Sequence, residues 1–190
     1  MKRTRFTSWH FALLLAAVFL FLTGRNSPSA PQTQAPAPSW QVYFSPHGGA
    51  TSAIVHALDQ ATESIWVQAY SFTSEPIAEA LVRAHARRVE VQVLLDISQR
   101  TQKYTAADML IRAGIPVFID ASHAIAHNKV MIIDNETVIT GSFNFTKAAE
   151  ERNAENLLII RSKGLAVRYL GNWHAHQGHS MPYSEHANLK

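Results

Sequence analysis

Between residues 40 and 173 the chain alternates short apolar, β-favouring runs with segments in which apolar residues recur every three or four positions. The runs predict strands over residues 41–45, 65–70, 89–95, 115–119, 129–133, 137–140 and 156–160. The other segments predict helices that start near Gly49 and Ser74 and that cover residues 106–113 and 164–173. Several strands are apolar along their whole length, so both faces of the sheet must be covered. We therefore expect an α/β domain with a mixed, largely parallel sheet covered by helices on both faces.

The N-terminal segment is typical of an exported protein. Lys2, Arg3 and Arg5 precede a twelve-residue apolar run over residues 11–22, which matches the charged and hydrophobic regions of a signal peptide. The run is shorter than the roughly 20 residues that a membrane span needs. We assign residues 1–25 to a signal peptide or, if it is retained, to an N-terminal membrane anchor. In both cases the expected location of the domain is periplasmic or secreted.

Composition separates a linker from one folded domain. Residues 26–39 are rich in Pro, Ser, Ala and Gln and carry no charge, so we expect a disordered linker there. About 150 residues follow it, which is enough for one domain with a real core. We place this domain over residues 40–180 and a tail over residues 181–190.

Charge is unevenly distributed along the chain. The sequence has 17 Lys and Arg residues and 14 Asp and Glu residues, a net charge of +3. Four of the basic residues precede the linker, whereas every acidic residue follows it, which leaves 13 basic and 14 acidic residues after residue 25. A polyanion must then be held by local groups and not by overall charge. The absence of cysteine excludes disulfide bonds and thiolate metal sites.

The most informative stretch leads into one predicted strand and follows the next. His127 and Lys129 are two residues apart in an extended segment, so their side chains share a face. Ser142 and Asn144 are also two apart, and Gly141 before them allows a close approach of backbone or ligand. One imidazole, one ammonium and two neutral polar groups suit an anionic phosphate better than a metal ion, so we expect no metal and no cofactor there.

These residues resemble the signature of the phospholipase D superfamily, which is His-x-Lys, four residues, Asp, six residues and Gly-Ser-x-Asn. The residues that carry it here are His127, Lys129, Asp134, Gly141, Ser142 and Asn144. Residues 140–150 and 153–156 further resemble the small bacterial endonucleases of that superfamily, and the resemblance extends from about residue 44 to residue 173. A lone His-x-Lys would be weak evidence, whereas the full spaced set is specific.

The resemblance implies a reaction of two histidines on a phosphodiester. One histidine attacks phosphorus and forms a phosphohistidine, while the other protonates the leaving oxygen. The chain carries one copy of the motif, so we expect a C2 homodimer in which His127 of each subunit faces a shared site. A coupled pair of imidazoles suits this reaction near neutral pH, because one can be neutral while the other is charged.

The resemblance also implies roles for the remaining residues. Lys129 and Asn144 would hold the non-bridging oxygens, with Ser142 assisting, in place of the divalent metal of other nucleases. Glu155 would accept a hydrogen bond from the far nitrogen of His127 and fix its tautomer. Asp134 lies at a strand end, seven residues from His127, and we assign it a structural role.

Other polar and aromatic residues have simpler interpretations. His174, His176 and His179 suggest zinc by their spacing, but no acidic or thiol partner accompanies them in the sequence, so we assign them to a solvated C-terminal tail. Tyr70 could stack on a base, although aromatic residues in strands are more often part of the core. The arginines within residues 83–88 are interpreted as a solvated helix face and not as a phosphate-binding patch.

The sequence therefore predicts a metal-independent phosphodiesterase, and in particular a nonspecific endonuclease that acts on DNA, with RNA as a second substrate. A membrane-associated phospholipase D or cardiolipin hydrolase is the main alternative, because the chemistry is the same and a retained N-terminal segment would hold the site at a membrane. An inactive nucleic-acid-binding module is the second alternative. Small size favours the nuclease, since a groove without a long second lobe would be open to a polymer.

Overall fold

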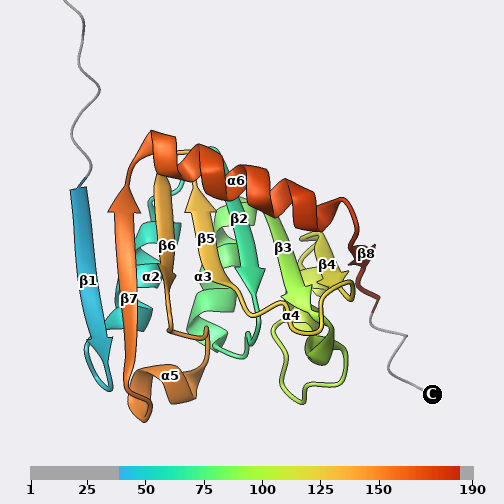
Figure 1. Cartoon of the computed structure of the whole chain (residues 1–190), viewed down its shortest axis with the longest axis horizontal. Coiled ribbons are helices and arrows are strands. Elements are labelled where there is room, and N and C mark those ends of the chain that lie inside the picture. The colour runs from blue at the N-terminus through green and yellow to red at the C-terminus, as the bar shows by residue number, and fades with distance from the viewer. Residues whose placement is uncertain (1–38, 185–190) are drawn as a thin grey trace, which may run out of the picture. The chain divides into compact units, whose positions relative to one another are not determined.

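The computed structural model describes residues 39–184, which form one sheet with helices on both faces (Figure 1). The predicted signal segment and nearly all of the predicted linker lie outside the described residues. The sheet has eight strands in the order β1-β7-β6-β5-β2-β3-β4-β8. In chain order the elements are β1 (Ser39–Ser45), α2 (Ala50–Asp59), β2 (Ser64–Ala69), α3 (Glu75–Ala86), β3 (Glu90–Asp96), the 3-10 helix η1 (Ile97–Arg100), α4 (Ala107–Arg112), β4 (Val117–Asp120), β5 (Lys129–Ile133), β6 (Thr137–Gly141), α5 (Lys147–Glu151), β7 (Glu155–Arg161), α6 (Lys163–Gln177) and β8 (Met181–Pro182).

The sheet is mixed, as predicted, but most of its neighbouring strands are antiparallel. Within residues 39–184, parallel pairing is confined to β2–β3 and β3–β4. The other neighbouring pairs are antiparallel, so the prediction of a largely parallel sheet is wrong. Apolar strands show that both faces of a sheet are covered, but they do not show strand direction. Direction depends on the connections, and the turn between β5 and β6 is too short for a parallel crossover.

Alternate residues of the central strands fill two separate cores. Val67 of β2 and Leu95 of β3 belong to the core that includes Leu81 of α3. Their neighbours Trp66 and Leu94 belong to the core beneath α6. Figure 1 shows α6 across one face of the sheet and α2 and α3 across the other. This division follows from the two-residue repeat of a strand, and it confirms the α/β class with helices on both faces.

One tryptophan fixes α6 to the sheet. Trp173 is fully buried, and its ring centroid lies 4.9 Å from that of Trp66 in β2. Its Nε1 also donates a hydrogen bond to the main-chain O of Val67 at 2.9 Å. An aromatic pair of this kind contributes about 0.5–1.5 kcal/mol beyond the burial of area. The position of α6 along the sheet is therefore well determined, which matters for the residues at its C-terminal end.

The fold extends beyond its predicted C-terminal boundary. His174 and His176 lie in α6 and His179 follows it directly, so their assignment to a solvated tail is wrong. β8 then pairs with β4, and the main-chain N of Tyr183 donates a hydrogen bond to Val117 O at 2.8 Å. At least part of the predicted tail over residues 181–190 therefore belongs to the domain. No helix within residues 39–184 combines the length and apolar character that a membrane span requires.

Candidate active site

The predicted site residues meet at one end of the sheet. β5 begins at Lys129, β6 ends at Gly141 and β7 begins at Glu155. Because β6 runs antiparallel to both β5 and β7, these three ends coincide. They lie near α5, toward the bottom of Figure 1. His127, just before β5, and Ser142, just after β6, are thereby brought together, so the structure places the two halves of the motif side by side.

Two main-chain anchors hold the segment that leads to His127. The carboxylate of Asp96, at the end of β3, accepts hydrogen bonds from the main-chain N of Ala126 at 2.7 Å and of Ser98 at 2.9 Å. One residue after His127, the main-chain O of Asn128 accepts a hydrogen bond from Tyr70 N at 2.7 Å. The backbone of His127 is thus fixed on both sides, whereas the residue itself is exposed.

Tyr70, His127 and Lys129 form one contact group. The ring centroids of Tyr70 and His127 are 4.6 Å apart, and Lys129 Nζ lies 5.1 Å from the Tyr70 centroid. Lys129 Nζ also donates a hydrogen bond to the main-chain O of His127 at 2.9 Å. Burial lowers the pKa of Lys129, and the charge of Glu155 opposes this effect. Lys129 is 6% exposed, so its ammonium group is partly desolvated and is suited to an anionic ligand.

Tyr70 was not among the predicted site residues. Its position is set by β2, which pairs with β5 so that Ala69 lies opposite Lys129. Tyr70 is the next residue along the chain, and it therefore leaves the sheet beside the His-x-Lys segment. The sequence signal that could have placed it is the end of the apolar run of β2, but the partner strand of β2 could not be read from the sequence.

Two buried phenylalanines direct Ser142 and Asn144 toward the site. Phe143 and Phe145 are fully buried and alternate with the two polar residues, which must then point to the other side of the extended segment. Asn144 Oδ1 is buried and has no hydrogen-bond partner within residues 39–184. An unsatisfied buried carbonyl oxygen costs about 1–3 kcal/mol, and a ligand that brought a hydrogen-bond donor to it would recover that cost.

Glu155 binds the serine and not the histidine in this single chain. Its Oε2 accepts a hydrogen bond from Ser142 Oγ at 2.6 Å, and its Oε1 accepts one from Asn153 Nδ2 at 3.1 Å. Within the described part of the chain the His127 ring makes no hydrogen bond, so the expected contact between Glu155 and His127 is not formed. The charge of Glu155 acts on Lys129 instead. The roles assigned to His127 and Glu155 in catalysis stay predictions.

Gly141 brings β6 and β7 together because it has no side chain. Its φ is +149°, and a Cβ atom there would overlap the main-chain O of Asn156 in β7. The same oxygen accepts hydrogen bonds from the main-chain N of Ser142 at 3.1 Å and of Phe143 at 3.2 Å. The close approach that the sequence indicated at Gly141 is therefore made by backbone, and it sets where Ser142 leaves the sheet.

Asp134 lies at the opposite end of β5, in the turn to β6. Asp134 and Asn135 have φ values of 51° and 52°, as in the type I′ turn of a tight hairpin. The Asp134 carboxylate accepts hydrogen bonds from the main-chain N of residues 62–64 and from Thr62 Oγ1, at 2.8–3.2 Å. Burial raises the pKa of Asp134, but these hydrogen bonds outweigh burial and lower it. Asp134 thus ties the hairpin to the chain that enters β2, which accords with the structural role assigned to it.

A second polar cluster lies at the end of β4, around Asp120. Asp120 Oδ2 lies 2.9 Å from His123 Nδ1, 2.7 Å from His176 Nδ1 and 3.4 Å from His179 Nε2. Burial raises the pKa of Asp120, but hydrogen bonds from these rings and from Ser122 N outweigh burial and lower it well below its ordinary value. Sequence analysis missed the cluster because Asp120 precedes His176 by 56 residues, and only the packing of α6 brings them together.

The segment that carries the candidate site matches known proteins. Residues 54–175 match the family model described as "Cardiolipin synthase, PLD-like domain". A protein named phospholipase D from Rickettsia conorii is 52% identical over 130 residues, which cover 68% of this chain and 65% of that protein. The human mitochondrial cardiolipin hydrolase is 35% identical over 115 residues, or 60% of this chain and 46% of that protein. The chain thus spans about 65% or less of the length of these two relatives.

A solved structure of the phospholipase D family matches a larger share of the chain. Nuc from Salmonella typhimurium, described as a phospholipase D family member, superimposes with a TM-score of 0.75 at 41% sequence identity. The match covers 78% of this chain and 99% of Nuc. Both the sheet and the ends of β5, β6 and β7 therefore lie within a fold that a relative of similar size shares.

Proposed function

Because the chain belongs to the phospholipase D superfamily, in the branch that includes Nuc, we propose that it is a metal-independent phosphodiesterase whose substrate is a nucleic acid. In particular, it is a nonspecific endonuclease that hydrolyses DNA, and RNA as a second substrate, through a covalent phosphohistidine at a homodimer interface. The observation that carries the proposal is the convergence of His127, Lys129, Ser142 and Asn144 at one end of the sheet.

The donor set supports phosphate binding without a divalent ion. The buried ammonium of Lys129 and the amide of Asn144 are donors that can hold non-bridging oxygens as negative charge develops on them. The same ammonium would repel a divalent cation placed beside it. Asn144 Oδ1 accepts no hydrogen bond within residues 39–184, and the Nδ2 group of this side chain would be the donor to a phosphate oxygen.

The reaction proceeds in two displacements. A ring nitrogen of His127 attacks phosphorus, so that a P–N bond forms while the P–O bond to the leaving group breaks, and the partner subunit's His127 gives its proton to the leaving oxygen. Water then attacks phosphorus, passes a proton to the partner subunit's His127 and breaks the P–N bond. Both histidines return to their starting states, and each step has an acid or a base in place.

A second subunit supplies the second histidine, because the described residues contain one copy of the motif.

An apolar surface on β1 supports the dimer. Trp40, Val42 and Phe44 are two apart and share one side of this edge strand, where Trp40 is 66% and Phe44 64% exposed. Phe44 pairs with Asn156, next to Glu155. Exposed apolar groups gathered in this way are typical of an interaction surface.

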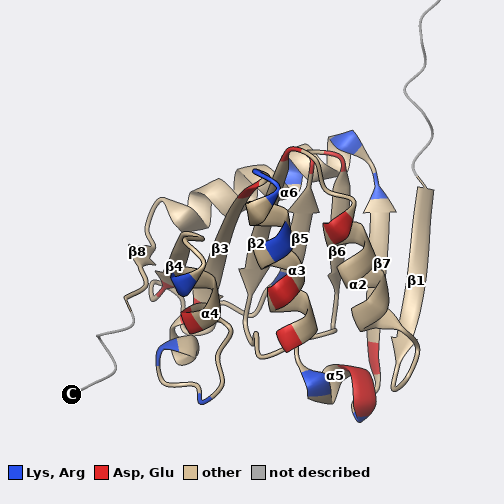
Figure 2. Cartoon of the chain, turned by 180° about the vertical axis from the view of Figure 1, so that it is seen from behind, with Lys and Arg blue, Asp and Glu red and all other residues tan. Residues whose placement is uncertain are grey.

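The alternative substrate is a phospholipid, and the names of the relatives favour it. Phospholipase D and cardiolipin hydrolase are the names of proteins that are 52% and 35% identical to this chain over 130 and 115 aligned residues. Against it stands the match to Nuc over nearly all of Nuc's length, together with the likeness of residues 140–150 and 153–156 to small bacterial endonucleases. Figure 2 shows basic and acidic segments interspersed over the helices, so a polyanion would depend on the groups of the site itself.

The test is an assay of three substrates with one set of proteins. The wild type, His127→Ala and the control His56→Ala are incubated with plasmid DNA, RNA, and vesicles of phosphatidylcholine with cardiolipin, with and without excess EDTA. His56 is an exposed residue of α2 outside the motif. We expect DNA cleavage by the wild type and His56→Ala, unaffected by EDTA, and a loss of at least about 10⁴-fold in His127→Ala.

Each part of the proposal has its own contradicting result. Hydrolysis of lipid with intact DNA would transfer the assignment to the phospholipase. Activity that disappears in EDTA while the circular dichroism spectrum is unchanged would contradict metal independence. DNA binding without turnover in all three proteins would leave the inactive binding module. A sedimentation measurement that gave an active monomer would exclude the shared site.

A further inference from the structure

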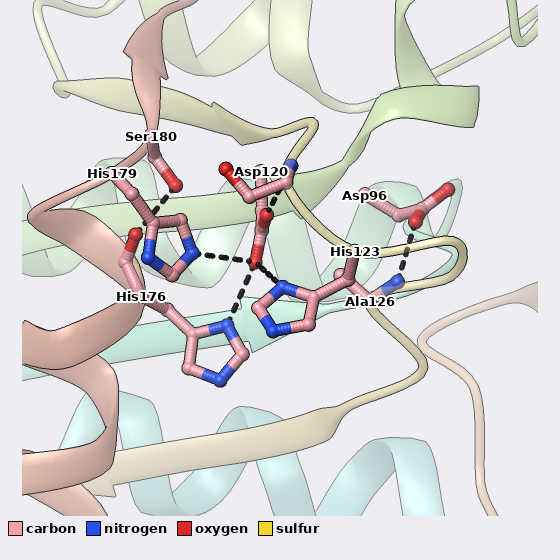
Figure 3. A network of polar contacts seen from close by, with 8 residues as sticks. Asp96, Asp120, His123, Ala126, His176, His179 and Ser180 are labelled. Atoms are coloured by element: carbon pink, nitrogen blue, oxygen red, sulfur yellow. Dashed lines mark hydrogen bonds and ion pairs between the residues drawn. The ribbon is translucent and has the colours of Figure 1, made fainter.

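The cluster around Asp120 draws its side chains from two distant parts of the chain. Asp120 ends β4 and His123 lies in the loop over residues 121–128, whereas His176 lies in the last turn of α6 and His179 just after it. Figure 3 shows the three imidazole rings converging on one oxygen of Asp120. One ligand atom from each of the four residues lies within 4.8 Å of all the others.

The three rings form a crowded arrangement if hydrogen bonds to Asp120 are their only role. All three rings approach the same carboxylate oxygen, while the other oxygen accepts a hydrogen bond from Ser122 N at 3.0 Å. If all three imidazoles were protonated, three positive charges would face one carboxylate, with ring centroids only 4.6–5.4 Å apart. If they are neutral, each needs its single N–H aimed at an oxygen that already has two competitors.

We propose that Asp120, His123, His176 and His179 bind one divalent transition-metal ion, of which zinc fits best. Three imidazole nitrogens and one carboxylate oxygen form a four-ligand set of the type that zinc takes. Zinc bonds of about 2.0–2.1 Å would place tetrahedral ligand atoms about 3.4 Å apart. The separations from Asp120 Oδ2 are 2.7–3.4 Å and all four ligand atoms lie within 4.8 Å of one another, so the side chains would have to adjust to bind the ion at this spacing.

The surroundings fit a structural site with an entry path. Asp120 is fully buried and is held by Ser122 N, which orients its carboxylate. Ser180 Oγ donates a hydrogen bond to the main-chain O of His176 at 2.8 Å and so fixes the turn after α6. The side chains of His123 and His179 are 46% and 37% exposed, which leaves one side of the cluster open to solvent.

The ion would connect α6 to the loop between β4 and β5. α6 packs on one face of the sheet through Trp173, and the loop over residues 121–128 carries both His123 and His127. A metal bound to His123 and to the end of α6 would tie that loop to the helix. The cluster contains none of the groups proposed to contact phosphate, so the ion takes no part in the phosphodiester reaction. It stabilises the loop and the end of α6, and cleavage without the ion is still expected because Asp96 and Tyr70 hold the backbone on both sides of His127.

The test uses the full chain, produced without a polyhistidine tag and freed of metal by a chelator. Zn²⁺ is titrated into the apoprotein by calorimetry, and Co²⁺ by visible absorption, which reports tetrahedral coordination. We expect one ion per chain, and an affinity lowered by at least about 100-fold in His176→Ala and in His179→Ala. His174→Ala is the matched control, because His174 is an exposed neighbour on α6 outside the cluster.

Stability and exchange give readouts that do not depend on activity. Zinc at 100 times its Kd is expected to raise the Tm of the wild type by roughly 5–10 °C and to leave His179→Ala unchanged. It is also expected to slow amide hydrogen exchange over residues 121–128. A wild type that binds neither ion, or whose affinity is the same in His176→Ala, His179→Ala and His174→Ala, would overturn the proposal. The exposed position of His179 keeps the test valid if His176→Ala fails to fold.

Discussion

The two ends of β5 carry polar residues of the same motif in opposite states. At the Asp134 end the carboxylate accepts hydrogen bonds from three main-chain N–H groups and one hydroxyl, and its pKa is lowered by them. At the Lys129 end a desolvated ammonium, an exposed His127 ring and an unsatisfied Asn144 amide lie together. The first arrangement lowers the free energy of the folded chain, whereas the second leaves polar groups ready for a ligand.

Of the three substitutions considered, replacing Lys129 by methionine is expected to have the largest effect on turnover. Methionine keeps the unbranched stem but removes the ammonium that would hold the non-bridging oxygens. We expect turnover to fall by about 10²–10³-fold while the free energy of unfolding stays the same or rises, because a desolvated charge is lost. Single-turnover kinetics measure the rate of turnover, and urea unfolding of the same preparation measures the free energy of unfolding. A clear loss of stability would make Lys129 a structural residue like Asp134.

Gly141→Ala tests the point at which the two halves of the motif meet. A Cβ atom at this position would overlap the main-chain O of Asn156, so β6 and β7 must move apart. We expect a loss of about 2–4 kcal/mol in the free energy of unfolding, together with reduced activity, since Ser142 leaves the sheet from this residue. Thermal unfolding followed by circular dichroism measures the first effect. Gly164→Ala, in open space on α6, is the control and should not destabilise the domain.

Asp134→Asn is expected to have the smallest effect, and one that depends on pH. The variant should lose about 1–3 kcal/mol of stability at pH 7 and keep the turnover of each folded molecule. The folded-state pKa of Asp134 lies below its unfolded value, so its contribution is fully present above about pH 4 and is lost as pH falls through the folded pKa. The difference between the two proteins in urea unfolding should therefore shrink on acidification. A difference that is constant down to pH 2 would contradict this account.

Local patterns predicted the parts of the fold that depend on neighbouring residues. The apolar runs indicated the strands, and the structure brings the His-x-Lys and Gly-Ser-x-Asn segments beside each other because a short turn joins β5 to β6. Strand direction was partly wrong, since β1 and β7 pair antiparallel across more than a hundred residues that no local pattern describes. The same limit hid Tyr70, whose place depends on the pairing of β2 with β5.

Long-range contacts also determine where the C-terminal histidines lie, which the sequence did not predict. Their spacing suggested zinc, but no acidic or thiol partner accompanies them nearby in the sequence. Asp120 supplies it from the end of β4, where the packing of Trp173 sets the position of α6. The expected contact between Glu155 and His127 is also absent from the single chain. The Glu155 carboxylate instead accepts a hydrogen bond from Ser142 Oγ.

The order of strands in the sheet has a consequence for how the chain acquires its fold. β1 is the first described strand, yet its partner is β7, and Ser39 pairs with Arg161. The contact order of this pair is high, so β1 cannot be joined to the sheet until nearly the whole domain has been synthesised. Until then its apolar residues stay exposed in the nascent chain. Closing this edge is thus expected to be a late step of folding, and a delay in it leaves a β-strand free to pair with another molecule.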